Sequence, residues 1–301
     1  MESENEKKNT RVTARDVARA AGVSVATVSY VMNDRPDQKI KPETKKKILQ
    51  MANLMNYVPS HAAKSLATGR NNIIGISYCM TGIPTYDSKI MLFSSMMTER
   101  LNRLKYDVMF IPAPVRENVL IINRNIDAII AIDLKHDDFK ALADSYLVPV
   151  ICVDMCVDDE LFYQIYDDIP FLIEKAKMEL GISDKYYFLY DNINNAGYEQ
   201  FVLKLPGDVF PLRLRDLTEE VLNNLKGQKV ITLGGFLTLK VMQDLNPSDI
   251  CCIISDNEQS LLPEGPKTVL DNGEKKANLT INILLNSLKR NFTVNHDLKV
   301  R

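Results

Sequence analysis

The sequence "TARDVARAAGVSVATVSYVMN", residues 13–33, predicts two short helices joined by a turn. Thr13 and Asp16 have the spacing of a capping box, in which each side chain satisfies a backbone N–H at the start of a helix. Gly22 marks the end of this helix, because glycine readily adopts the left-handed conformation that follows a last helical turn. Ser24 is a favourable N-cap for the second helix.

A helix, a turn with glycine and a second helix form the layout of a helix-turn-helix, whose second helix enters the major groove of DNA. Many helical hairpins share this layout, so it is a weak signal alone. The second helix has one apolar side, formed by Val28, Val31 and Met32. A third helix is expected to begin at Pro42, since proline suits a first helical position. Its inner side would consist of Ile48, Met51, Ala52 and Met55.

Charge is unevenly spread along the chain. Residues 1–72 contain 13 Lys and Arg against 7 Asp and Glu, whereas the remainder contains 24 against 32. A basic head on an acidic body favours a head that meets a polyanion. The alternative is a solvated basic face, and both interpretations hold for Lys45, Lys46 and Lys47 at the start of the third helix.

The composition is that of a globular protein of two or three domains, with 301 residues, 46% of them apolar, and a net charge of −2. The first ten residues are polar and no apolar run approaches the ~20 residues of a membrane span, so we expect a soluble cytoplasmic protein. Cys79, Cys152, Cys251 and Cys252 lie in apolar runs and are expected to be buried free thiols. The cysteines and histidines show no metal-ligand spacing, so no metal or other cofactor is predicted.

A further short helix is expected over residues 61–67, within "YVPSHAAKSLATGR". A helix of this length is not stable alone. Together, residues 12–75 resemble the LacI/GalR family of bacterial transcription regulators. The resemblance is carried by "DVARAAGVSVATVSYVMN", "TKKKILQMANLMNYVPSHAAKSLATGR" and "IIGI", which follow the family pattern in order and at nearly its spacing.

The resemblance implies that residues 24–32 form the recognition helix. Val25 and Ala26 match the base-reading positions, where small apolar side chains contact thymine methyl groups but make no hydrogen bonds to bases. Tyr30 stands where the family most often has an arginine, which puts the usual half-site sequence in doubt. The positions that typically hold phosphates, which set register rather than sequence, are Thr13, Ser24, Thr27 and Asn33.

The helix over residues 61–67 resembles the family's hinge helix, which pairs with its copy across a dyad on DNA. The hinge and minor-groove residues that the resemblance assigns are Ser60, Ala63 and Leu66. Leu66 matches a leucine that wedges into the central base step, and such wedges kink the duplex at an unstacking cost of roughly a few kcal/mol. The alternative is an ordinary core leucine.

After residue 71, apolar strands alternate with amphipathic helices, which predicts parallel, doubly wound sheets in two lobes. The resemblance implies the same α/β body, similar to periplasmic binding proteins, behind a small all-α head. The predicted segments are a disordered tail over 1–12, a helix-turn-helix domain over 13–58, a hinge over 59–71 and the body over 72–301. The expected lobes are 72–162 with later returns, and 163–258 with the C-terminal segment.

Ligands of such folds bind at the carboxyl ends of strands, here in the cleft between the lobes. Asn194 stands where the family has an arginine that grips a sugar hydroxyl or carboxylate, so a bidentate donor is lost. Asp256, by contrast, matches a cleft aspartate. The predicted effector residues are Tyr86, Asn194 and Asp256. Three interpretations stay open: a different small molecule, a protein partner, or no ligand, and cleft sites are the default for this architecture.

No Ser-His-Asp order, Walker loop or G-x-G-x-x-G loop occurs, so neither an enzyme nor a catalytic residue is predicted. The leading prediction is a sequence-specific DNA-binding transcription regulator that acts as a repressor. It would bind a pseudo-palindromic operator as a homodimer in the nucleoid, with control by a small molecule or a regulatory protein and no membrane partner. The alternatives are a small-molecule sensor without a DNA role and a regulator whose body has lost ligand binding.

Overall fold

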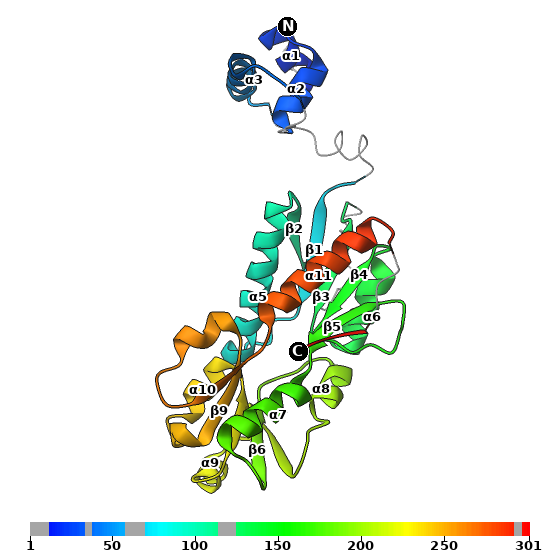
Figure 1. Ribbon diagram of the computed structural model, residues 1–301. Helices are drawn as coiled ribbons and strands as arrows, with labels where there is room; N and C mark the ends of the chain where they lie inside the picture. The colour runs from blue at the N-terminus through cyan, green and yellow to red at the C-terminus, as the bar shows by residue number, and fades with distance from the viewer. Residues whose placement is uncertain (1–11, 34–37, 58–69, 114–124, 292–296) are drawn as a thin grey trace, which may run out of the picture. The chain divides into compact units, whose positions relative to one another are not determined.

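The computed structural model describes residues 12–33, 38–57, 70–113, 125–291 and 297–301 (Figure 1). The chain divides into two compact units, a head over residues 1–71 and a body over residues 72–301. The tail over 1–11, residues 34–37 and most of the predicted hinge, with Ser60, Ala63 and Leu66, lie outside the described residues. No helix of the described part is long and apolar enough to cross a membrane.

The head consists of three helices, α1 (Ala14–Ala21), α2 (Val25–Met32) and α3 (Pro42–Leu54). Val17, Val28 and Ile48, one from each helix, are fully buried against one another. Both predicted caps are present: Thr13 and Asp16 form a capping box, and the Ser24 hydroxyl accepts a hydrogen bond from the Thr27 backbone N–H at the start of α2. Gly22 has a φ of 68° between α1 and α2, a conformation that favours glycine.

The body contains two parallel sheets. The first has the strand order β11-β5-β4-β3-β1-β2 and the second the order β10-β9-β8-β6-β7. All neighbouring strands in both sheets pair in parallel. The first sheet is formed by β1 (Ile73–Tyr78), β2 (Asp107–Pro112), β3 (Ala128–Ile132), β4 (Val150–Val153), β5 (Tyr163–Asp167) and β11 (Asp297–Val300). The second is formed by β6 (Tyr186–Tyr190), β7 (Val209–Arg213), β8 (Val230–Leu233), β9 (Ile250–Ile254) and β10 (Lys267–Leu270).

Helices cover the sheets, as the doubly wound prediction requires. Figure 1 shows α5 and α11 side by side along the first sheet, and their inner residues share one apolar core with β1, β3 and β4. In the second lobe α7 packs on the strands β8, β9 and β10. The helices are α5 (Pro84–Arg103), α6 (His136–Ser145), α7 (Ile169–Leu180), α8 (Ala196–Val202), α9 (Glu219–Leu225), α10 (Gly235–Val241) and α11 (Gly273–Leu288). Short 3-10 helices occur at η1 (Leu214–Asp216), η2 (Pro247–Asp249) and η3 (Asp256–Leu261). The predicted fold class, a helical head and an α/β body of two parallel sheets, is confirmed.

The lobe boundaries differ from the expected ones. Residues 163–167, expected in the second lobe, form β5 of the first sheet, because this strand pairs with β4 and with β11. The chain therefore enters the second lobe after Asp167 rather than before residue 163. β10 extends the second lobe beyond residue 258, and the C-terminal segment, expected in the second lobe, returns to the first sheet as β11. α11 packs on that same first lobe.

All five cysteines are free thiols. Cys152, Cys251 and Cys252 are buried as expected, but Cys79 is only partly buried, since it follows the end of β1 where the strand leaves the core. Within the described residues no group of three or more His, Cys, Asp or Glu side chains could hold a metal ion.

Candidate nucleic-acid interface and interlobe pocket

The start of α2 presents small apolar side chains at the surface of the head. Val25 is 44% exposed and Ala26 is also exposed, while Val28 and Val31, on the opposite side of the helix, are buried in the head core. Tyr30 is partly buried. A short helix that is anchored by one side and presents small apolar side chains at its N-terminal end has the shape and chemistry to enter a major groove.

The four residues expected at phosphates have structural roles within the head. Thr13 caps α1, and the hydroxyls of Ser24 and Thr27 lie 2.8 Å apart at the start of α2. The Asn33 side-chain amide donates to the Ser29 carbonyl over 2.8 Å at the end of α2. Thr13, Ser24 and Asn33 are nevertheless exposed and Thr27 is partly exposed, so their polar atoms are placed at the surface by the caps that hold them.

The body has a pocket between its two lobes, with about 630 Å³ of space, its solvent-open side included. The first lobe contributes the start of α5 and the loops after β3 and β4. The second lobe contributes the loop after β6, the start of α10 and the segment after β9. These are the carboxyl ends of parallel strands, where ligands of such sheets bind. The polar residues of its lining are Thr85, Tyr86, Lys89, Asp133, Asp154, Asp191, Asn192, Tyr198 and Glu258.

Asp133, directly after β3, joins the two lobes across this pocket. Its carboxylate accepts hydrogen bonds from the Tyr86 hydroxyl at 2.8 Å and from the backbone N–H groups of Asn194 and Asn195 at 3.0 and 2.8 Å. The Asn194 side chain completes the contact by donating to the Tyr86 oxygen at 2.8 Å. Burial raises the pKa of Asp133 to about 7, although these hydrogen bonds act in the opposite direction.

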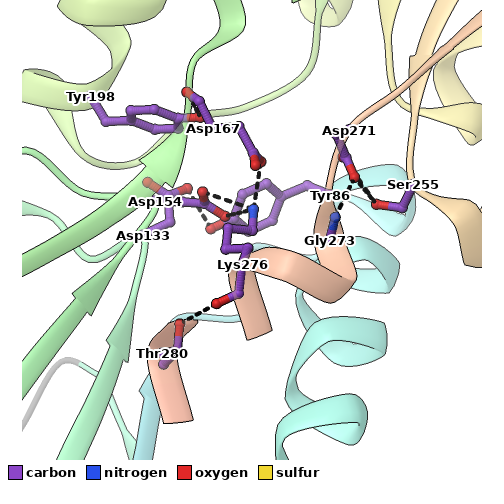
Figure 2. Close-up of polar contacts among 10 residues, drawn as sticks. All are labelled: Tyr86, Asp133, Asp154, Asp167, Tyr198, Ser255, Asp271, Gly273, Lys276 and Thr280. Atoms are coloured by element: carbon purple, nitrogen blue, oxygen red, sulfur yellow. Dashed lines mark hydrogen bonds and ion pairs between the residues drawn. The ribbon is translucent and has the colours of Figure 1, made fainter. Parts of the chain in front are cut away.

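Lys276 of α11 forms a buried cluster of charges with Asp154 and Asp167 (Figure 2). Its ammonium group contacts both carboxylate oxygens of Asp154 at 3.0 Å and one oxygen of Asp167 at 2.5 Å. Burial opposes the charge of Lys276, but the two aspartates outweigh it and raise the pKa of the lysine. Burial also raises the pKa of Asp167, partly offset by Lys276. Asp154 follows β4 and Asp167 ends β5, so the lysine links two strand ends at the passage between the lobes.

The comparisons with known proteins agree with the head described above. Residues 13–60 match the family described as "Bacterial regulatory proteins, lacI family". This head is a lacI-family module. The match begins at the N-cap of α1 and includes α1, α2 and α3 in full.

The curated proteins that this chain resembles are described as transcription regulators. The head is 46% identical over 67 residues to the probable transcriptional repressor ExuR of Bacillus subtilis, which covers 22% of this chain and 20% of the relative. The sucrose operon repressor of Klebsiella pneumoniae is 30% identical over 169 residues, 54% of this chain and 49% of the relative. These matches span between a fifth and a half of the relatives' own lengths.

Solved structures share the fold over more of the chain. The lac repressor dimer bound to operator and an anti-inducer has a TM-score of 0.66 at 16% identity and covers 97% of this chain and 96% of its own. A periplasmic binding protein/LacI regulator from Alkaliphilus metalliredigens, solved with D-xylulofuranose, has a TM-score of 0.56 at 14% identity over 76% of this chain and 95% of its own. At these identities the likeness concerns the fold.

The three residues expected in the effector cleft have different positions in this body. Tyr86 lines the pocket, and Asn194 lies behind it through its bond to Tyr86. Asp256 is exposed at the start of η3 and is not among the pocket's lining residues, whereas Glu258, two residues further on, is buried and lines the pocket. The sequence analysis did not identify three residues in or behind the pocket, Asp133, Glu258 and Lys276. For Asp133 a signal existed, since it directly follows the fully apolar strand "AIIAI".

The raised pKa of Asp133 predicts a pH dependence of stability. In the unfolded chain this carboxyl ionises near pH 3.8, whereas in the folded body it holds its proton up to about pH 7. The folded state therefore binds more protons between these values, and the body should lose stability as pH rises from about 5 to 8. Denaturant unfolding of wild type and Asp133→Asn over this range, followed by circular dichroism, measures the effect. We expect the free energy of unfolding of the wild type to fall by roughly a few kcal/mol over this range. The Asp133→Asn variant should not show this fall.

Asp137→Asn provides the matched control, because Asp137 lies in the first turn of α6 and is exposed. It should keep the wild-type decline. Equal pH slopes for wild type and Asp133→Asn would show that Asp133 is already ionised at pH 5 and would contradict the prediction.

Proposed function

We propose that this protein is a sequence-specific DNA-binding transcription regulator that acts as a repressor. Two copies of the head would bind the half-sites of a pseudo-palindromic operator as a homodimer located with the nucleoid. The observation that carries the proposal is the exposed N-terminal end of α2, with Val25 and Ala26 outward, within a segment that matches the lacI family. The curated relatives with this segment are described as repressors or transcription regulators, which supports the same activity here.

The proposed contacts follow from the chemistry of the exposed side chains. Val25 and Ala26 would contact thymine methyl groups in the major groove, and Tyr30 would contribute to the choice of base at a third position. The surface hydroxyls and amide of Thr13, Ser24, Thr27 and Asn33 would hold phosphates and fix the register. Ser60, Ala63 and Leu66 would act at the minor groove between the half-sites.

Control of DNA binding by a small molecule is part of the proposal. The interlobe pocket collects polar side chains from both lobes, and the solved structures that share the fold include a CelR–cellobiose complex. A ligand that binds one arrangement of the lobes more tightly shifts the equilibrium, and the effect on DNA affinity is reciprocal. The alternative of a body that has lost ligand binding predicts no heat on titration with any metabolite. A sensor without a DNA role predicts no specific DNA complex.

Selection of bound fragments from random DNA tests the function. The proposal predicts enrichment of one motif with two inverted half-sites. Recovery of unrelated fragments, with no shared motif after several rounds, would overturn it.

Replacing Tyr30 by Ala should change the preferred base at one position in each half-site, because the residue's contact with the groove is removed. Tyr30→Phe is the matched variant, since it keeps the ring and deletes the hydroxyl. Selection with each variant measures the change, and good base contacts contribute about 1–3 kcal/mol to discrimination. If the Tyr30→Ala variant selects the same motif as the wild type, Tyr30 does not contribute to the choice of base.

A further inference from the structure

We propose that the interlobe pocket takes a positively charged small molecule, an organic amine with an apolar part. The inference rests on the proposed function, in which a small molecule enters this pocket, and it adds the chemical class of that molecule. It follows from the balance of charge in and behind the pocket, from two carboxylates that each have one oxygen without a donor among the described residues, and from the apolar walls.

The lining of the pocket carries more negative than positive charge. Four carboxylates line it, whereas Lys89 is the one cationic side chain among its described lining residues. The carboxylates come from both lobes: Asp133 and Asp154 from the first, and Asp191 and Glu258 from the second. An anion would enter a site of the same sign, while a cation would be attracted from both walls.

The buried cluster behind the lining lacks one positive charge. Lys276 pairs with both Asp154 and Asp167, so two carboxylates share a single ammonium group. Asp167 is 1% exposed, and its second oxygen has no hydrogen-bond partner among the residues that the structure describes. A buried acceptor without a donor is costly. Because the same lysine holds Asp154, a ligand ammonium at Asp154 would let Lys276 interact more strongly with Asp167.

Glu258 presents a second carboxylate of this kind to the pocket. The residue is 3% exposed, and one of its oxygens accepts a long hydrogen bond of 3.4 Å from the Ser255 backbone N–H. The described part of the chain provides no donor for its other oxygen. The segment after β9 thus holds a nearly buried carboxylate at the pocket with half of its hydrogen-bonding capacity unused, and an ammonium group supplies both the charge and the donors that it lacks.

The walls of the pocket fit the apolar part of an amine. Tyr198 and Phe236 provide aromatic rings and Ile90 and Leu237 provide aliphatic surface. Aromatic faces attract organic cations. The described lining residues include no arginine, and Asn194 uses its amide to bond Tyr86, so these residues offer no bidentate anchor for an anionic ligand. Lys89 is only partly buried, and lysine side chains can extend their charge into water.

Three compounds that differ only at one end test the charge class: tyramine, which is cationic, tyrosol, which is neutral, and 4-hydroxyphenylacetate, which is anionic. Isothermal titration into the full chain at pH 7.5 measures their dissociation constants. We expect tyramine to bind at least tenfold more tightly than tyrosol and 4-hydroxyphenylacetate to bind most weakly. Three results would overturn the proposal that the pocket prefers a cation: equal binding of all three compounds, tighter binding of the anion, or no binding of tyramine.

Glu258→Gln links the binding to the pocket. Glutamine keeps the hydrogen bond to the Ser255 N–H, since Glu and Gln serve equally in a capping box, but it removes the charge. We expect the preference for tyramine over tyrosol to fall by at least threefold in this variant. Asp216→Asn, which deletes a surface carboxylate in η1, should keep the wild-type preference. An unchanged preference in Glu258→Gln, or an equal loss in Asp216→Asn, would show that the cation binds elsewhere.

A small-molecule extract of a bacterium, separated by ion exchange into cationic, neutral and anionic fractions, extends the test beyond one scaffold. We expect only the cationic fraction to raise the melting temperature of the full chain. If the anionic or neutral fraction raises it alone, the charge class is wrong but small-molecule control stands. If no fraction raises the melting temperature, both the charge class and small-molecule control are wrong. Binding of the ligand-free chain to its selected DNA tests the regulator function separately.

Discussion

Lys276→Met is expected to destabilise the body by about 3–5 kcal/mol, because it leaves Asp154 and Asp167 buried beside each other without their cation. Methionine approximates the length of the lysine stem, so lost packing contributes little. Urea unfolding followed by circular dichroism measures the change. The head has its own core and should unfold at its wild-type denaturant concentration.

The triple variant Asp154→Asn, Asp167→Asn, Lys276→Met separates charge from packing. Without buried charges, most of the lost stability should return, since replacing a whole buried ionic cluster by neutral groups costs far less than removing one partner. Lys275→Met is the matched surface control, because Lys275 precedes Lys276 in α11 and is exposed. If Lys276→Met unfolds at the wild-type midpoint, the buried ion pairs do not contribute to the fold as we describe.

Leu66→Ala is expected to weaken binding to the selected operator by roughly a few kcal/mol, which is the energy scale of an apolar wedge in a minor-groove step. The position lies outside the described residues, and the expectation comes from the resemblance of "SHAAKSLATGR" to the family's hinge. Gel-shift titration of wild type and variant at one salt concentration measures the loss. The free proteins should have the same melting temperature.

Leu66→Met keeps an apolar side chain of similar volume and should retain most of the affinity. A further discriminating measurement is the bend of the bound DNA, which should decrease in Leu66→Ala because the wedge opens the central step. Equal affinity of the alanine variant and wild type would assign Leu66 to ordinary packing instead.

Local signals in the sequence were sufficient for the head. The caps at Thr13 and Ser24 depend on residues within one helical turn, so their spacing predicts them directly. The inner residues Val28 and Ile48 follow helical periodicity for the same reason. The buried strands β3, β4 and β9 are continuous apolar runs, and they too could be predicted from short stretches of sequence.

Features that depend on distant partners could not be predicted. The sequence of β5 is "YQIYD", and its position in the first sheet depends on pairing with β4 and β11. The prediction that this segment belongs to the second lobe was therefore wrong. Lys276 lies in "EKKAN" and resembles any surface lysine of a helix. Its burial is decided by Asp154 and Asp167, more than a hundred residues earlier in the chain. Asp133 similarly owes its role to Asn194 and Asn195 from the other lobe.

The most direct test of the central claim is a footprint of the full chain on its selected DNA, combined with binding titrations across salt. We predict protection of two inverted half-sites and a steep decrease of the binding constant with salt, as phosphate contacts release counterions. Protection should weaken at bases facing Val25 and Ala26 when thymines there are replaced by uracils, which lack the methyl group. A chain that protects no sequence over competitor DNA at any salt concentration would contradict the account.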